Sequence, residues 1–183
     1  MVKTPLIKPV EDNKAKNKTY SRIMQKYNEA MENGFYGEAE LIVYAYLEDQ
    51  LKGFIYYSDG MDVRNSRKIN DKLQVITGCG EGIDDITAKI SVIEKLLKLC
   101  DDKTVQDDYI KYLRQIYKVS IKPSELKSQL KKVRKWCEYR NEIIHSLLNK
   151  DIDALHEGYE SHVREGFNLA RYIDTQVRSL RRA

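Results

Sequence analysis

The sequence has few of the residues that interrupt helices or crosslink chains. Among 183 residues there are 9 glycines and 3 prolines, so long stretches contain neither. Long uninterrupted helices are therefore favoured. The 3 cysteines are widely spaced and form no Cys-x-x-Cys pair, which argues against a disulfide framework and against a zinc site. We expect neither a metal nor a bound cofactor.

Long apolar runs and a strong charge of one sign are also missing. No apolar stretch is long enough to span a membrane, and the polar, lysine-rich start lacks the apolar core of a signal peptide. We therefore expect a cytoplasmic protein with no membrane partner. The formal net charge of +4 is a mild excess, which permits an RNA partner without requiring one.

What the sequence has instead is a balance of 42% hydrophobic and 33% charged residues, which is typical of amphipathic helices. Apolar side chains recur at helical spacing, and no strand-like alternation of useful length is found. We predict an all-α fold, a bundle of five or six helices. A flexible tail is predicted for residues 1–18 and a single helical domain for residues 19–183.

Several residues are typical of helix ends. A first helix is predicted from Thr19 to Asn33, where Asn33-Gly34 is typical of a helix stop. Pro123 suits the first turn of a long helix. Residues 58–82 are polar and contain several glycines, and we predict a long loop there. Candidate N-caps for the helices after it are Asp84 or Asp85, and Thr104.

Two charged residues stand where the helical pattern predicts apolar side chains. Arginine cannot lose its charge in a protein, and an unpaired buried charge costs several kcal/mol. Arg140 therefore needs a carboxylate partner, a polar cleft or an interface, and we hypothesise that Glu48 is its partner. The apolar stripe around Glu48 comprises Leu41, Tyr44, Leu51 and Ile55, and the seam around Arg140 comprises Leu126, Leu130, Val133, Cys137, Ile144 and Leu147.

Asn141 and His145 follow Arg140 on the same predicted helix. They are four residues apart, so they share a face and can reach a common ligand. Arg140 and His145 are five residues apart, which is about 140° around an ideal helix. A site that uses both side chains therefore needs a loosened helix end or a second copy of the helix facing the first.

The segment from Arg140 to His145, with Asn141 directly after the arginine, resembles the R-x(4–6)-H motif of HEPN-domain ribonucleases. Its place late in a long helix followed by one more helix is also similar. The resemblance implies two protomers whose motif helices face each other, so that one cleft holds both arginines and both histidines. It implies RNA cleavage without a metal, leaving a 2′,3′-cyclic phosphate. Many such proteins are toxins or antiviral-defence factors, and others have no nuclease activity.

The leading hypothesis is a homodimeric, metal-independent endoribonuclease that can have an antitoxin partner. His145 would move protons, Arg140 would hold the phosphate, Asn141 would position the substrate, and Glu48 would support Arg140. The alternative is a non-catalytic helical module that binds RNA, a nucleotide or a protein partner. A DNA-binding repressor is less favoured, because no short helix-turn-helix pattern is found.

Structural roles are predicted for the other reactive side chains. Cys137 has no adjacent base and is predicted to lie in the core. His156 and His162 have no metal-pair spacing and are predicted to lie at the surface. The last helix is predicted to begin near residues 151–153, and its inward face comprises Ile152, Leu155, Tyr159, Val163, Gly166, Ala170, Ile173, Val177 and Leu180.

Overall fold

The computed structural model describes residues 13–58, 85–146 and 152–182, and every regular element in these ranges is a helix. The predicted all-α bundle of five or six helices is confirmed. Most of the predicted loop at residues 58–82, and residues 1–12 of the predicted tail, lie outside the described residues. The helices are α1 (Asn13–Glu32), α2 (Tyr36–Ser58), α4 (Ile86–Asp101), α5 (Asp108–Ser120), α6 (Pro123–Ser146) and α7 (Ile152–Leu180).

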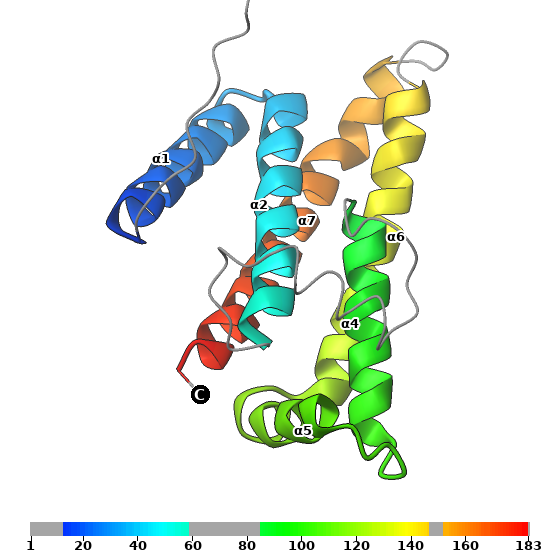
Figure 1. The fold of residues 1–183 in the computed structure, drawn as a ribbon. Helices are drawn as coiled ribbons and strands as arrows, with labels where there is room; N and C mark the ends of the chain where they lie inside the picture. The colour runs from blue at the N-terminus through cyan, green and yellow to red at the C-terminus, as the bar shows by residue number, and fades with distance from the viewer. Residues whose placement is uncertain (1–12, 59–84, 147–151, 183) are drawn as a thin grey trace, which may run out of the picture.

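Helices α2 and α7 form the centre of the bundle and share its most extensive interface (Figure 1). α1 packs against α2, and α4 joins α2 to the α5–α6 side. The apolar stripes predicted for these helices supply most of the core. The fully buried side chains along the central interface include Val43, Leu47, Leu51, Phe54, Val163, Ala170, Ile173 and Val177.

The helix ends follow local hydrogen-bonding rules. Gly34 has φ +72°, and the N–H of Phe35 donates to the carbonyl of Ala30 at 2.8 Å, which is the Schellman pattern predicted by the Asn33-Gly34 pair. Asp85 caps α4 by accepting from the N–H of Ala88 at 2.6 Å. α6 begins at Pro123 as predicted. α1, in contrast, begins at Asn13, so residues 13–18 belong to the helix and not to the tail.

The predicted N-cap at Thr104 is wrong. Asp107 caps α5 by accepting from the N–H of Ile110 at 3.0 Å. Thr104 instead donates its backbone N–H to the Asp102 carboxylate at 2.9 Å. This Asx-type turn closes the end of α4 and delays the start of the next helix.

Helices α6 and α7 approach each other closely at Trp136. Its indole N–H donates to the carbonyl of His162 at 2.9 Å, and a Cβ added at Gly166 would overlap the indole ring. Glycine at position 166 therefore sets the spacing between the motif helix and the helix that follows it. Within the described ranges, no helix combines the length and the apolar character needed to cross a bilayer.

Candidate functional site

Arg140 lies in the last part of α6, where the end of that helix meets the start of α2. Its guanidinium carbon lies 4.2 Å from the centroid of the Tyr44 ring, a cation–π contact. The side chain is only 14% exposed. Two contacts therefore restrict the guanidinium, the Tyr44 ring on one side and a carboxylate of α2 next to it.

That carboxylate is Glu40 and not Glu48, so the pairing predicted for Glu48 is wrong. Arg140 Nε lies 4.0 Å from Glu40 Oε2, and the Glu40 side chain is 3% exposed. Glu48 lies two turns farther along α2, where its Oε1 is 3.0 Å from Lys89 Nζ of α4. Glu40 and Glu48 flank Tyr44 one turn on either side, and the end of α6 reaches only the first turns of α2.

Glu40 is the centre of a buried polar cluster that joins α2, α6 and α7. Its Oε2 accepts a hydrogen bond from the Tyr159 hydroxyl at 3.1 Å, and its Oε1 lies 3.2 Å from His162 Nε2. Burial and the neighbouring Glu40 carboxylate raise the pKa of the Tyr159 hydroxyl, so this group stays protonated and donates. The cluster places one carboxylate against a permanent positive charge, a hydroxyl donor and an imidazole.

His162 is buried, so its predicted surface position is wrong. Its side chain is 5% exposed, and its ring stacks on Trp136 with centroids 5.0 Å apart and planes at 12°. Tyr139 meets the same ring edge-on at 4.8 Å. The helical spacing of α7 places His162 beside Val163 on the covered face, and α6 supplies the aromatic cover. The side chain of His156 lies outside the described residues.

Three atoms of this cluster are buried without an aligned hydrogen bond among the described residues: Arg140 Nε, Glu40 Oε1 and His162 Nε2. Arg140 Nε and His162 Nε2 each lie close enough to the Glu40 carboxylate for electrostatic attraction. The distance or angle of each contact does not meet hydrogen-bond criteria. The Arg140–Glu40 attraction is therefore mainly electrostatic. In a site this buried, removal of one charge of the pair would leave the other uncompensated.

Asn141 and His145 are both exposed on the outer side of the motif helix. Asn141 Oδ1 accepts a hydrogen bond from Arg140 Nη1 at 3.3 Å, so these two predicted site residues are brought together. α6 continues as a helix through Ser146, so His145 points about 140° away from Arg140. No contact between the Arg140 and His145 side chains is found in the described structure.

The surface near the motif also differs from the predicted seam. Ile143 is the buried residue, at 4% exposure, whereas Ile144 is 39% exposed and Tyr139 is 47% exposed. After Arg140, the buried face of α6 is therefore shifted by one residue from the predicted seam. This rotation leaves an isoleucine and a tyrosine at the surface of the same helix that carries Asn141 and His145. On α2, Leu41 is 60% exposed, although its spacing predicted an inward position.

Cys137 lies in the core as predicted, and burial raises the pKa of its thiol to about 11. The thiolate is therefore scarce at neutral pH, which disfavours a nucleophilic role. Among the described residues, no group of three or more His, Cys, Asp or Glu side chains is arranged to hold a metal ion.

Sequence reasoning missed Glu40, Tyr159 and His162 as members of this cluster. Glu40 had a detectable signal, because it stands one turn before Tyr44 on the same helix, as Glu48 stands one turn after it. His162 had no comparable signal. Comparison with known protein families, curated proteins and solved structures gives no significant match to this chain.

Proposed function

We propose that this chain is a metal-independent endoribonuclease whose active site forms between two copies of α6. The observation that carries this proposal is the arrangement at the end of that helix. Arg140 is fixed between Tyr44 and Glu40, and it directs Nη1 toward the exposed Asn141. His145 is exposed one turn beyond Asn141. Together these groups place a guanidinium, an amide and an imidazole at one end of one helix.

The chemistry of RNA cleavage needs these groups. The 2′-hydroxyl oxygen attacks the adjacent phosphorus, and its proton passes to one imidazole as general base. The bond from phosphorus to the 5′-oxygen breaks, and the leaving oxygen takes a proton from a second imidazole. Histidine titrates near neutrality and can serve in either role. The guanidinium offers a two-pronged contact to the phosphate oxygens as their negative charge builds up.

A second copy of the chain supplies what one copy lacks. In a single α6 helix, His145 points away from Arg140, and only one imidazole is present. Two α6 helices that face each other would bring the histidine of one copy toward the arginine of the other. The exposed Ile144 and Tyr139 side chains provide apolar and aromatic surface for that contact.

Glu40 takes over the role that the sequence suggested for Glu48. A carboxylate that is 3% exposed and 4.0 Å from Nε restrains the guanidinium without covering the nitrogen that faces Asn141. Tyr44 restrains it from the ring side. Such fixed donors are more effective in catalysis, because they need not reorganise as charge develops. Glu40 is accordingly a positioning residue.

The biological role that fits such an activity is growth arrest or antiviral defence. An uncontrolled ribonuclease harms the cell that makes it, so a neutralising antitoxin protein is the partner that we propose. The resemblance of the Arg140–His145 segment to HEPN ribonucleases supports this role. A cytoplasmic location, where RNA is the substrate at hand, is part of the same proposal.

The decisive experiment is RNA cleavage by the purified protein in excess EDTA. We expect single-stranded RNA to be cut to products ending in a 2′,3′-cyclic phosphate, and a 2′-deoxy substitution at the cut site to block the reaction. Arg140→Ala and His145→Ala should each reduce the rate at least about 100-fold, the scale of one acid–base group or one oxyanion contact. Cleavage that is unchanged in both variants would overturn the proposal.

The matched control is Arg134→Ala. Arg134 lies on the same helix, and its Nη2 is 3.0 Å from Glu94 Oε2 in a half-exposed pair. Such a pair contributes at most about 1 kcal/mol to stability. The control removes a guanidinium from α6 without touching the proposed site, so its cleavage rate should stay within about twofold of the native rate.

A non-catalytic binding module is the alternative, and the burial of Arg140 against Glu40 favours it. In that case the guanidinium serves only to neutralise a buried carboxylate. The alternative predicts RNA binding without strand scission. It also predicts that Arg140→Ala and Glu40→Gln change only the stability of the fold. The cleavage experiment distinguishes this outcome from a catalytic role.

A further inference from the structure

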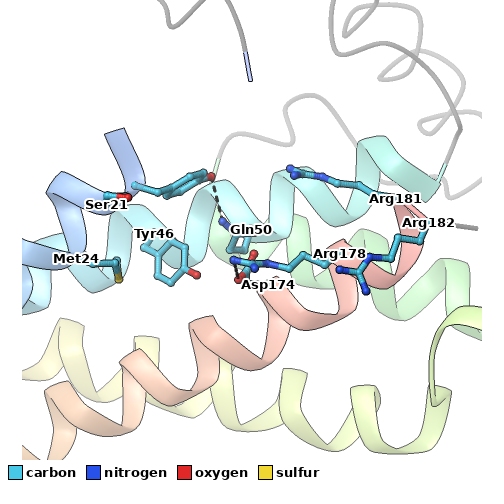
Figure 2. A pocket seen from close by; sticks show the side chains of 9 residues that line it. Ser21, Met24, Tyr46, Gln50, Asp174, Arg178, Arg181 and Arg182 are labelled. Atoms are coloured by element: carbon cyan, nitrogen blue, oxygen red, sulfur yellow. Dashed lines mark hydrogen bonds and ion pairs between the residues drawn. The ribbon is translucent and has the colours of Figure 1, made fainter. Parts of the chain in front are cut away.

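A second polar hollow lies at the other end of the central helix pair. It is a groove of about 660 Å³ where the end of α7 meets α1 and the middle of α2 (Figure 2). The rise of 1.5 Å per residue places Arg178 about 24 Å from His162 along α7. The groove is therefore separate from the Arg140 cluster, although the same two helices build both.

Positive charge dominates the lining of this groove. Arg178, Arg181 and Arg182 come from the end of α7, and Asp174 is the one carboxylate among the described lining residues. Arg178 Nη2 lies 2.7 Å from Asp174 Oδ2, so this pair is internally neutral. Arg181 and Arg182 are exposed. Asp49 lies next to the groove, where its carboxylate accepts a hydrogen bond from the Tyr20 hydroxyl. Three guanidinium charges therefore face two carboxylates and the partial negative charge of about half a unit at the carbonyl end of α7, which leaves a small positive excess.

The side chains at the base of the groove are polar and hydrogen-bond to one another. Gln50 is 3% exposed, and its amide donates to the Tyr20 hydroxyl at 3.1 Å. In Figure 2, Arg178 lies beside Asp174 and Gln50, and Arg181 extends back toward them from the end of its helix. Guanidinium groups thus border a floor made of an amide and a phenol, and the phenol hydroxyl is held by the Asp49 carboxylate.

Of the two aromatic rings that line the groove, Tyr46 is buried and Tyr20 is half-buried. Tyr46 is 8% exposed, and its ring meets Tyr20 edge-on at 5.8 Å and Phe167 at 6.5 Å. A buried ring in this position cannot serve as a platform for a nucleobase. The groove therefore offers charge and hydrogen-bond donors but little stacking surface, and such a surface recognises phosphates without reading bases.

We infer that this groove binds the phosphodiester backbone of single-stranded RNA and extends the substrate path away from the Arg140 site. The choice of RNA rests on the proposed function. Arginine makes two-pronged contacts to phosphate oxygens, and it does so without regard to sequence. At about 3.4 Å per nucleotide, a stacked strand of about seven nucleotides spans the 24 Å between the two sites.

The test is a binding titration in the His145→Ala background, where the RNA stays intact. A fluorescent uridine oligonucleotide of about 20 residues is titrated by anisotropy between about 50 and 200 mM salt. The variant is Arg181→Gln with Arg182→Gln, which leaves the Arg178–Asp174 pair in place. The matched control is Lys95→Gln with Lys98→Gln, which removes the same charge from exposed positions on α4.

We expect the arginine variant to weaken binding about tenfold at the lowest salt. The slope of log Kd against log salt should fall by about 1.4, which is about 0.7 for each phosphate of a single strand that an arginine no longer neutralises. The lysine control should keep the native slope and stay within about twofold in Kd. Thermal unfolding followed by circular dichroism verifies that both variants are folded.

Three outcomes would overturn the inference. The arginine variant could bind the oligonucleotide as tightly as the parent protein, or both variants could show the same reduction in affinity. Alternatively, with the groove half occupied by the oligonucleotide, uridine monophosphate or inorganic phosphate at a similar concentration could displace the oligonucleotide. That last result would assign the groove to a small anion and not to a strand.

Cleavage of a dinucleotide in the His145-containing protein keeps this inference distinct from the proposed function. A dinucleotide cannot reach both sites, so Arg181→Gln with Arg182→Gln should leave its cleavage unchanged while lowering kcat/KM for the long RNA about tenfold. Failure to cleave either RNA would defeat the proposed nuclease. The anisotropy comparison would still decide whether the groove holds RNA.

Discussion

The Arg140 guanidinium stacks over the Tyr44 ring, 4.2 Å from its centroid. Tyr44 stands between Glu40 and Glu48 on α2, one turn from each, and Arg140 lies against its ring and next to Glu40. Glu48 is paired instead with Lys89 of α4. Because Glu40 also contacts Tyr159 and His162, the choice links the motif helix to α7.

Glu40→Gln tests this link. The amide keeps the shape of the side chain and can still accept from the Tyr159 hydroxyl, but Arg140 loses its countercharge in a buried site. We expect a loss of about 2–4 kcal/mol in the free energy of unfolding, since broken buried pairs cost on this scale. If the proposed nuclease is correct, cleavage should fall about 10–100-fold. Urea unfolding and cleavage assays on the folded variant measure the two effects.

Glu48→Gln is the counterpart. It removes the countercharge of Lys89, which is 4% exposed, but Glu48 itself is 40% exposed, so solvent moderates the loss. We expect about 1–2 kcal/mol of destabilisation and a cleavage rate close to native. An activity loss equal to that of Glu40→Gln would contradict the assignment of Glu40 as the residue that positions Arg140.

Two glycines of α7 make a matched pair for stability measurements. A Cβ at Gly166 would overlap the Trp136 indole, whereas a Cβ at Gly158 meets nothing within 4 Å. We expect Gly166→Ala to destabilise the fold by about 1–3 kcal/mol through overpacking. Gly158→Ala should stabilise it by about 0.5–1 kcal/mol, because alanine is the better helix former. Equal effects of the two substitutions on the urea midpoint would contradict the close approach of α6 and α7.

The parts of the fold that local chemistry determines could be predicted from the sequence. The Asn33-Gly34 stop, the Asp85 cap and the start of α6 at Pro123 depend on residues within one turn of the feature. The apolar stripes gave the helical class for the same reason. Thr104 shows the limit, because Asp102 holds its backbone N–H and hydroxyl in a turn and Asp107 caps the next helix instead. The sequence did not reveal which of these polar residues would be the cap.

The parts of the site that depend on neighbouring helices could not be predicted. Helical spacing indicates which residues share a face, but not which helix covers that face. Ile143 and Ile144 differ by one position, yet the first is buried and the second is 39% exposed. His162 is covered because Trp136 and Tyr139 reach it from another helix, and this contact leaves no mark in the sequence around position 162.

The raised pKa values of the buried cysteines give a prediction about thiol reactivity. Burial raises the thiol pKa of both Cys100 and Cys137 to about 11. A raised thiol pKa favours the neutral form, so at pH 8 only about 0.1% of each is the reactive thiolate. We expect alkylation of both by iodoacetamide to be very slow in the folded protein and to accelerate in urea. Peptide mass spectrometry resolves each site, and Cys137→Ser should leave RNA cleavage intact.

The strongest test of a shared active site is to mix two inactive variants. Arg140→Ala keeps His145, and His145→Ala keeps Arg140, so neither homodimer has a complete set of groups. A mixed dimer pairs the one remaining histidine of one copy with the one remaining arginine of the other, and the proton transfer of the missing second imidazole passes to water. Since α6 points these two side chains about 140° apart within one chain, we expect mixing to restore a measurable fraction of the native cleavage rate. Tagging the two variants differently allows the mixed dimer to be isolated. Inactivity of that species would mean that the reaction needs both imidazoles, or that each copy must supply its own arginine and histidine.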